Sequence, residues 1–299
     1  MLPLHAALVK GFFAEEGLNV QGSEADMRAA FEQGKPHALW INTDGKLTEP
    51  DFGFIGMDQL HHVAAGEVDY YVVDGLNFGC QAILVPPDSP VKSTADLKGK
   101  TIAILPTDVE PFFWPNGSTF LNQGLRTSGL EAGKDVSLKP MPWDALPRLG
   151  EYLADGTKRG EFDAIHSFEP VTAMLEGQNL ARVVFSQALN QYCCLFGIKR
   201  AIVDGQPAKA ARIVRAFRSA KLWVAQNPVR AVVAAQTAGY HPPTPVDPTA
   251  ARVKIFGYDR EVDLGAMLER AFKERIDAGV IKADKTPAEL IRLHYRKIE

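Results

Sequence analysis

The chain has 299 residues, of which 46% are hydrophobic and 23% charged, and these proportions are typical of globular proteins. Its 33 Lys and Arg residues nearly balance 36 Asp and Glu residues, which gives a formal net charge of −3, and the basic residues are scattered. Composition therefore argues against nucleic acid and anionic membrane as partners. A chain of this length is expected to form two domains or lobes.

Several other classes of protein lack support in the sequence. The longest apolar runs have only a few residues, far fewer than the roughly 20 that cross a bilayer. No cysteine and histidine spacing typical of zinc occurs, so neither a metal nor a cofactor is expected. The three cysteines form no disulfide framework, and the adjacent Cys193 and Cys194 should point to opposite faces of a strand, which would place one in the core.

Apolar runs of strand length alternate with helical patterns over the first 200 residues, which predicts an α/β fold with a mainly parallel sheet. The expected strands lie at 18–20, 51–55, 70–73, 81–85, 101–105, 136–139, 162–166, 182–185 and 192–199. The expected helices lie at 4–15, 26–33, 57–65, 117–128, 143–156 and 170–176.

From Gln206 onward the pattern predicts helices only. Apolar residues recur with helical spacing from Ala210 to Val224, and Asn227-Pro228 ends this helix before another begins. A proline-rich segment at 242–245 is expected to be a rigid linker, with further helices at 262–278 and 287–294.

The order of these elements predicts a discontinuous first lobe. Prolines and charges cluster at 85–90, between two runs of βα units, and no further βα unit follows the strand at 192–199. We therefore expect residues 1–87 and 192–299, including the helical carboxyl-terminal region, to form lobe one, and residues 88–191 to form lobe two.

The segment Lys10-Gly-Phe-Phe-Ala-Glu-Glu-Gly-Leu-Asn-Val20 closely resembles a passage of the substrate-binding proteins of ABC importers for nitrate, sulfonate and taurine. Further resemblances follow in the family's order at 51–56, 95–103, 162–164, 169–170 and 217–228. Together they cover nearly the whole chain. They imply a two-lobed type II periplasmic-binding-protein fold, in which the ligand lies between lobes that close by hinge bending. The family's first strand, which usually precedes this passage, is missing from the expected elements.

The resemblance also implies a function and its partners. A member of this family would bind a small anionic solute, such as a sulfonate, taurine, nitrate or an aromatic acid, and deliver it to an ABC permease in the membrane. We expect a monomer that acts in the periplasm or another extracytoplasmic compartment. The chain as given begins without the basic segment and long apolar segment of a secretory signal.

Candidate ligand-binding residues lie where strands end and helices begin. Asn116, Gly117, Ser118 and Thr119 precede a helix whose free backbone N–H groups and dipole suit an anion, although the same residues also serve as ordinary helix caps. On the other lobe, Gly56, Met57 and Asp58 follow a strand, and the small Gly56 permits close backbone approach.

Four more residues complete this set of candidates. Phe113 and Trp114 lie in an aromatic loop. If exposed, this loop would contact a ring or alkyl part of a ligand, and if buried, it would belong to the core of lobe two. Asn77 ends a strand and offers a polar contact. Glu169 follows another strand, where it would accept from a ligand or cap its own helix.

Enzymes that share this fold are the alternative class. Fungal thiamine-pyrimidine synthases resemble this chain and have a histidine on the helix where His61 lies and a cysteine-rich run near Cys193 and Cys194. Aromatic sulfinate desulfinases use a nucleophilic cysteine near the start of the chain, but no cysteine precedes Cys80 here. No complete catalytic motif is present, so we expect a receptor without catalytic residues, and an enzyme that uses His61 and Cys194 is the second hypothesis.

Overall fold

The computed structural model describes residues 2–22, 41–42, 51–57, 60–79, 81–104, 119–141, 161–169, 171–186, 192–239, 244–282 and 284–299. The chain divides into two compact units. The first consists of Met1–Phe78, Asn190–Pro242 and Gly257–Glu299, and the second of Gly79–Leu189 and Pro243–Phe256. No helix within the described ranges has both the length and the apolar character needed to cross a membrane.

The first unit contains a five-stranded sheet in the order β1-β2-β3-β10-β4. Its strands are β1 (Gln21–Gly22), β2 (Ile41–Asn42), β3 (Phe52–Gly56), β4 (Tyr70–Asn77) and β10 (Cys194–Lys199). Strand β10 runs antiparallel to both β3 and β4, so these two strands run parallel to each other on either side of it. A strand from late in the chain therefore occupies the centre of the sheet.

Successive residues of these strands enter different hydrophobic cores. Phe54 and Phe196 belong to one cluster of buried residues, whereas their neighbours Ile55 and Leu195 belong to another. This alternation follows from the period of two along a strand. Both faces of the sheet are apolar, so both must be covered by helices.

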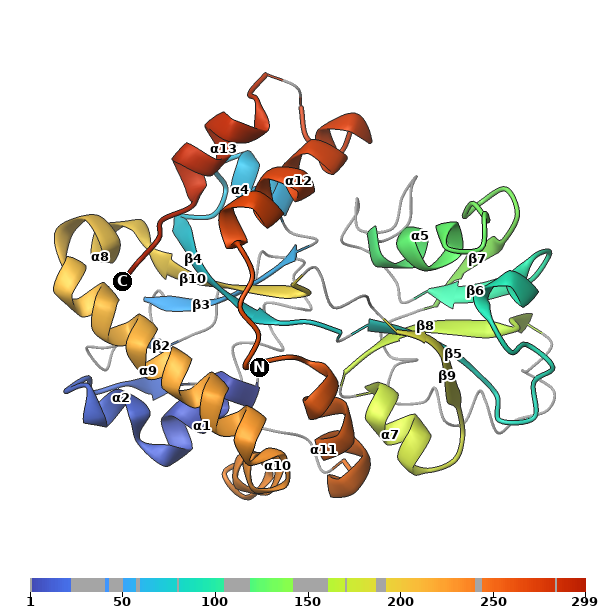
Figure 1. Ribbon diagram of the computed structural model, residues 1–299, viewed down its shortest axis with the longest axis horizontal. Helices are drawn as coiled ribbons and strands as arrows, with labels where there is room; N and C mark the ends of the chain where they lie inside the picture. Colours follow the sequence, from blue (N-terminus) through green and yellow to red (C-terminus); the bar gives the residue numbers. More distant parts are fainter. Residues whose placement is uncertain are drawn as a thin grey trace. The chain divides into compact units, whose positions relative to one another are not determined.

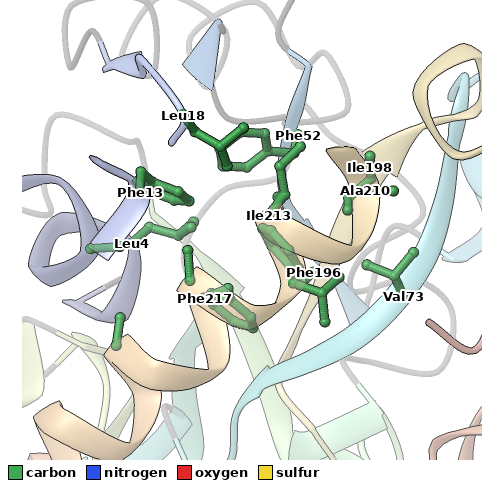
Figure 2. Packing of buried hydrophobic residues seen from close by; sticks show 14 of the residues in the cluster. Leu4, Phe13, Leu18, Phe52, Val73, Phe196, Ile198, Ala210, Ile213 and Phe217 are labelled. Atoms are coloured by element: carbon green, nitrogen blue, oxygen red, sulfur yellow. The ribbon is translucent and has the colours of Figure 1, made fainter. Parts of the chain in front are cut away.

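One face is covered by α1 (Leu2–Lys10), α2 (Phe12–Glu15), α8 (Arg200–Gly205) and α9 (Pro207–Gln226), and α10 (Pro228–Thr237) packs against α1 and α9. The other is covered by α4 (Leu60–Ala64), α12 (Leu264–Asp277) and α13 (Pro287–His294), as Figure 1 shows. On the first face the rings of Phe13, Phe52, Phe196 and Phe217 pack in series, with centroid separations of 5.2, 5.7 and 4.0 Å (Figure 2).

The packing explains why the segment around Gly11 has its particular residues. Gly11 has a φ of 79°, which an L-residue with a side chain rarely adopts, and it separates α1 from α2. Phe13 then points into the core beside Phe52, and Glu16 pairs with Arg215 of α9 at 2.7 Å. The single helix expected at 4–15 is therefore two helices, and the strand expected at 18–20 is irregular chain before β1.

The second unit contains a five-stranded sheet in the order β7-β6-β8-β5-β9. Its strands are β5 (Gln81–Val85), β6 (Thr101–Ile104), β7 (Ser137–Pro140), β8 (Ala164–Phe168) and β9 (Arg182–Ser186). Helix α5 (Thr119–Arg126) lies against one face and α7 (Val171–Gly177) against the other (Figure 1). The short helix η2 (Thr94–Leu97) packs on the same face as α5. Helix α11 (Val246–Ile255) packs on α7.

The expectation of mainly parallel sheets is wrong. Within the described strands only β6 pairs in parallel, with β7 and β8, whereas β10 and β5 each run antiparallel to both of their neighbours. The physical reason is that β5 and β10 each begin shortly after the chain crosses from one unit to the other, so no preceding βα unit sets their direction. Local alternation of strand and helix carries no information about that direction.

Two segments lie in the second unit although the sequence analysis assigned them to lobe one. Strand β5 pairs with β8 and β9, and α11 packs on α7. A Cβ on Gly177 of α7 would lie 2.9 Å from the Pro245 ring, which shows how closely the two helices approach. The expected helices at 26–33 and 143–156 lie outside the described residues. Leu222, which the helical pattern included in the apolar face of α9, is 49% exposed.

Candidate functional site

Three of the predicted site residues meet at one edge of the sheet in the first unit. Cys194, the first residue of β10, pairs with Gly56 at the end of β3 and with Asn77 at the end of β4. Met57 directly follows Gly56, and its backbone N–H donates to the Cys193 carbonyl at 2.9 Å. The carboxyl ends of two parallel strands and the start of the strand between them thus form a common edge. Asp58 lies outside the described residues.

The side chains at this edge already have structural roles. Asn77 is buried, and its Nδ2 donates to the Phe78 carbonyl at 3.2 Å, while its own carbonyl accepts from the Cys193 N–H at 2.7 Å. The Met57 side chain lies in the core, and its carbonyl accepts from Nη2 of the buried Arg275 at 2.8 Å. Gly56 is half-buried, so what this edge offers a ligand is mainly backbone.

A partly buried charge network lies two to three residues before Asn77. Lys221 of α9 donates to the Gly75 carbonyl at 2.6 Å and to Asp74 Oδ1 at 3.3 Å, and Arg218 donates to Asp74 Oδ2 at 2.7 Å. Burial lowers the pKa of Lys221, and the Asp74 carboxylate opposes that shift. The ring of Tyr192 covers Gly75, and burial raises the pKa of its hydroxyl.

The second unit has a corresponding edge. Strands β6 and β8 are parallel, so their carboxyl ends lie on the same side, and Gln81 begins β5 opposite Phe168 at the end of β8. His166 of β8 is fully buried, and its Nε2 lies 3.0 Å from Gln81 Oε1. Its ring stacks on Phe120 near the start of α5, at 5.3 Å. Burial lowers the pKa of His166 to about 3, so the ring is neutral at neutral pH.

Glu169 caps its own helix, which is one of the two roles considered for it. Its Oε2 accepts from the Ala173 N–H at 3.1 Å, and its Oε1 accepts from Arg252 Nε at 2.6 Å. Burial raises the pKa of Glu169, and the Arg252 guanidinium opposes this shift. Arg252 belongs to α11 and is separated from Glu169 by 83 residues, so no local pattern could have identified it.

The remaining predicted residues stay untested predictions. Phe113, Trp114, Asn116, Gly117 and Ser118 lie outside the described residues, and Thr119 is the first residue of α5.

The residues of the enzyme hypothesis are described in part. The ring centroids of His61 and His62 on α4 lie 3.9 Å apart with the planes tilted by 41°, and His62 Nδ1 lies 2.5 Å from Glu67 Oε2. Cys194 is not part of a disulfide, whereas Cys193 is disulfide-bonded, which the cysteine count had not indicated. Within the described ranges, no group of three or more His, Cys, Asp or Glu residues is arranged to hold a metal ion.

Comparison with known proteins identifies a family and a fold. The family described as "NMT1/THI5 like" matches residues 1–231. No match is found among the curated proteins.

Three solved structures illustrate the likeness in fold. The periplasmic aliphatic sulphonate binding protein SsuA from Escherichia coli is 20% identical, with a TM-score of 0.61, over 84% of this chain and 76% of that chain. The periplasmic nitrate-binding protein NrtA from Synechocystis PCC 6803 is 19% identical, with a TM-score of 0.65, over 97% and 82%. The desulfurization enzyme DSZB is 17% identical, with a TM-score of 0.66, over 96% and 92%. These likenesses confirm the periplasmic-binding-protein fold.

Proposed function

Because the chain belongs to the NMT1/THI5-like family, we propose that it is the solute-binding receptor of an ABC importer and that it binds a small organic anion. The observation that carries this proposal is the fold shared over most of the chain with the sulphonate-binding SsuA and the nitrate-binding NrtA. Each unit also has an edge where parallel strands end, which is where α/β folds commonly bind ligands.

The proposed ligand contacts follow from these two edges. In the first unit they comprise Gly56, Met57, Asp58 and Asn77, mainly through backbone groups. In the second unit they comprise Phe113, Trp114 and Asn116 to Thr119. Glu169 contributes indirectly, because both of its oxygens already accept hydrogen bonds.

The partner and the compartment are part of the same proposal. The protein delivers its ligand as a monomer to an ABC permease in the membrane, and it acts outside the cytoplasm. The disulfide at Cys193 supports this compartment, because disulfides persist in oxidising surroundings and are rare in the cytosol.

Ligand binding is expected to stabilise the protein. A ligand that binds only the folded state adds about 2.7 kcal/mol at 100 times its Kd. We expect at least one sulfonate, nitrate or aromatic acid to raise the midpoint of thermal unfolding, and native mass spectrometry to recover that ligand chemically unchanged. A broad panel of solutes that leaves the midpoint unchanged would count against a receptor.

An enzyme on the same fold is the second candidate, and the likeness to DSZB favours it. Its residues would be the Cys194 thiol at the strand-end edge and His61 on α4. This candidate requires that a bound compound be converted. If His61→Ala and Cys194→Ser leave ligand affinity unchanged and the ligand is recovered intact after long incubation, the receptor is supported over the enzyme.

A further inference from the structure

Arg252 is a buried cation with an unused hydrogen-bond donor. The residue is 6% exposed, and its side chain lies in the second unit, at the end of β8. Its Nε donates to Glu169, but its Nη2 is buried without a hydrogen-bond partner among the described residues. A buried donor left unsatisfied costs roughly 1–3 kcal/mol, so such groups generally have a partner in the functional state.

The position of Arg252 is imposed by its partners. Glu169 directly follows β8, and its other oxygen is held by the Ala173 N–H at the start of α7. This carboxylate therefore keeps the guanidinium next to the end of β8. Both oxygens of Glu169 already accept hydrogen bonds, so the carboxylate does not satisfy Nη2.

We propose that Arg252 is the anion-recognising residue of the second unit and that its Nη2 donates to an oxyanion of the ligand. This inference rests on the proposed receptor function and deepens it. A guanidinium is always protonated, and its planar N–H groups match the oxygens of carboxylates and sulfonates. Glu169 orients Arg252 and acts as a positioning residue.

The alternative is a purely structural ion pair, and two substitutions distinguish it from anion recognition. Arg252→Gln removes the donor charge and should weaken anion binding at least ten-fold. Glu169→Gln keeps an acceptor for Nε but weakens the charged pair that orients Arg252, so affinity should fall, by less than in Arg252→Gln. A structural pair would predict that both variants lose stability while affinity changes less than two-fold.

The experiment is calorimetric titration of the full chain with ethanesulfonate, nitrate and benzoate, and with ethanesulfonamide as an uncharged probe. Lys254→Gln is the matched control, because it removes a positive charge at an exposed position of the same helix and should leave affinity unchanged. Arg252→Lys keeps the charge but loses the planar fork, so it should bind more weakly than wild type. This variant and Glu169→Gln carry the test if Arg252→Gln does not fold.

Each outcome has a defined meaning. Anion binding that is weakened by Arg252→Gln and Arg252→Lys, to a smaller extent by Glu169→Gln, and not by Lys254→Gln, supports the proposal. Equal affinity in wild type and both Arg252 variants overturns it and leaves the receptor function standing. A wild-type protein that binds none of the three anions at millimolar concentration overturns anion recognition. Native mass spectrometry would then still detect a bound uncharged or cationic solute. A failure of the Arg252 proposal can therefore be distinguished from a failure of the proposed receptor function.

Discussion

Gly75→Ala is expected to destabilise the protein by about 3 kcal/mol or more, because the new methyl group would overlap an immobile aromatic ring. A Cβ on Gly75 would lie 2.1 Å from two carbons of the Tyr192 ring. Carbon atoms in contact are normally separated by about 3.5–4.0 Å. Tyr192 is 3% exposed and stacks on Phe78 at 4.2 Å, so its ring cannot move aside without leaving its buried position.

The matched control for this substitution is Gly205→Ala. Gly205 ends α8 and has no positive φ, and a methyl group added to it would meet no other atom within 4 Å. Its replacement is therefore expected to be neutral or to stabilise by roughly 0.4–1 kcal/mol.

Chemical denaturation of both variants measures the two effects. A double-mutant cycle with Tyr192→Ala identifies the cause, because Gly75→Ala should cost far less when the ring is absent. Strictly additive effects in this cycle, or a cost of Gly75→Ala below about 1 kcal/mol, would contradict the proposed overlap.

The second large effect is acid destabilisation through His166. Burial lowers the pKa of His166 in the folded protein to about 3, whereas an unfolded histidine has a pKa of 6.5. Between these values the unfolded state binds the proton and the folded state does not, so the free energy of unfolding falls as the pH falls. For one such group the loss is about 3 kcal/mol between pH 7 and pH 4.

His166→Gln tests this assignment because an amide cannot titrate but can still donate to Gln81. The variant should be less stable at pH 7, since it loses the ring contact with Phe120, but its stability should depend less steeply on pH. The measurement is urea denaturation at several values between pH 7 and pH 4.

His294 provides the comparison for His166→Gln. Burial and neighbouring cations lower the pKa of His294 to about 4, so His294 also destabilises the folded protein as the pH falls. This contribution remains in His166→Gln. If the free energy of unfolding falls equally steeply with pH in wild type and in His166→Gln, His166 does not contribute to the acid destabilisation.

Much of the local structure was predictable from the chain. The helical period after Gln206 identified α9, and its break at Asn227-Pro228 correctly separated α9 from α10. Apolar runs located β3, β4, β5 and β6, because strand and helix periods depend on residues close together in sequence. The order of elements also placed Gly56, Met57 and Asn77 at strand ends, and the structure brings them to one edge.

The features that the sequence did not predict share a different cause. The insertion of β10 between β3 and β4, the assignment of β5 and α11 to the second unit, and the cover of Tyr192 over Gly75 all depend on residues far apart in the chain. Strand direction and partner choice are set by which surfaces bury each other, and periodicity within one segment does not encode that choice.

For the candidate site, too, part was determined by the sequence and part only by the tertiary structure. The amino-acid sequence alone determined the family resemblance, the helix and strand content, and the positions where strands end and helices begin. Only the tertiary structure decided that Glu169 uses both oxygens within the protein and that Arg252 reaches it from α11. The reason is physical: a strand end is a local property of the chain, whereas a buried ion pair forms only when packing brings two distant charged groups together and removes water from them.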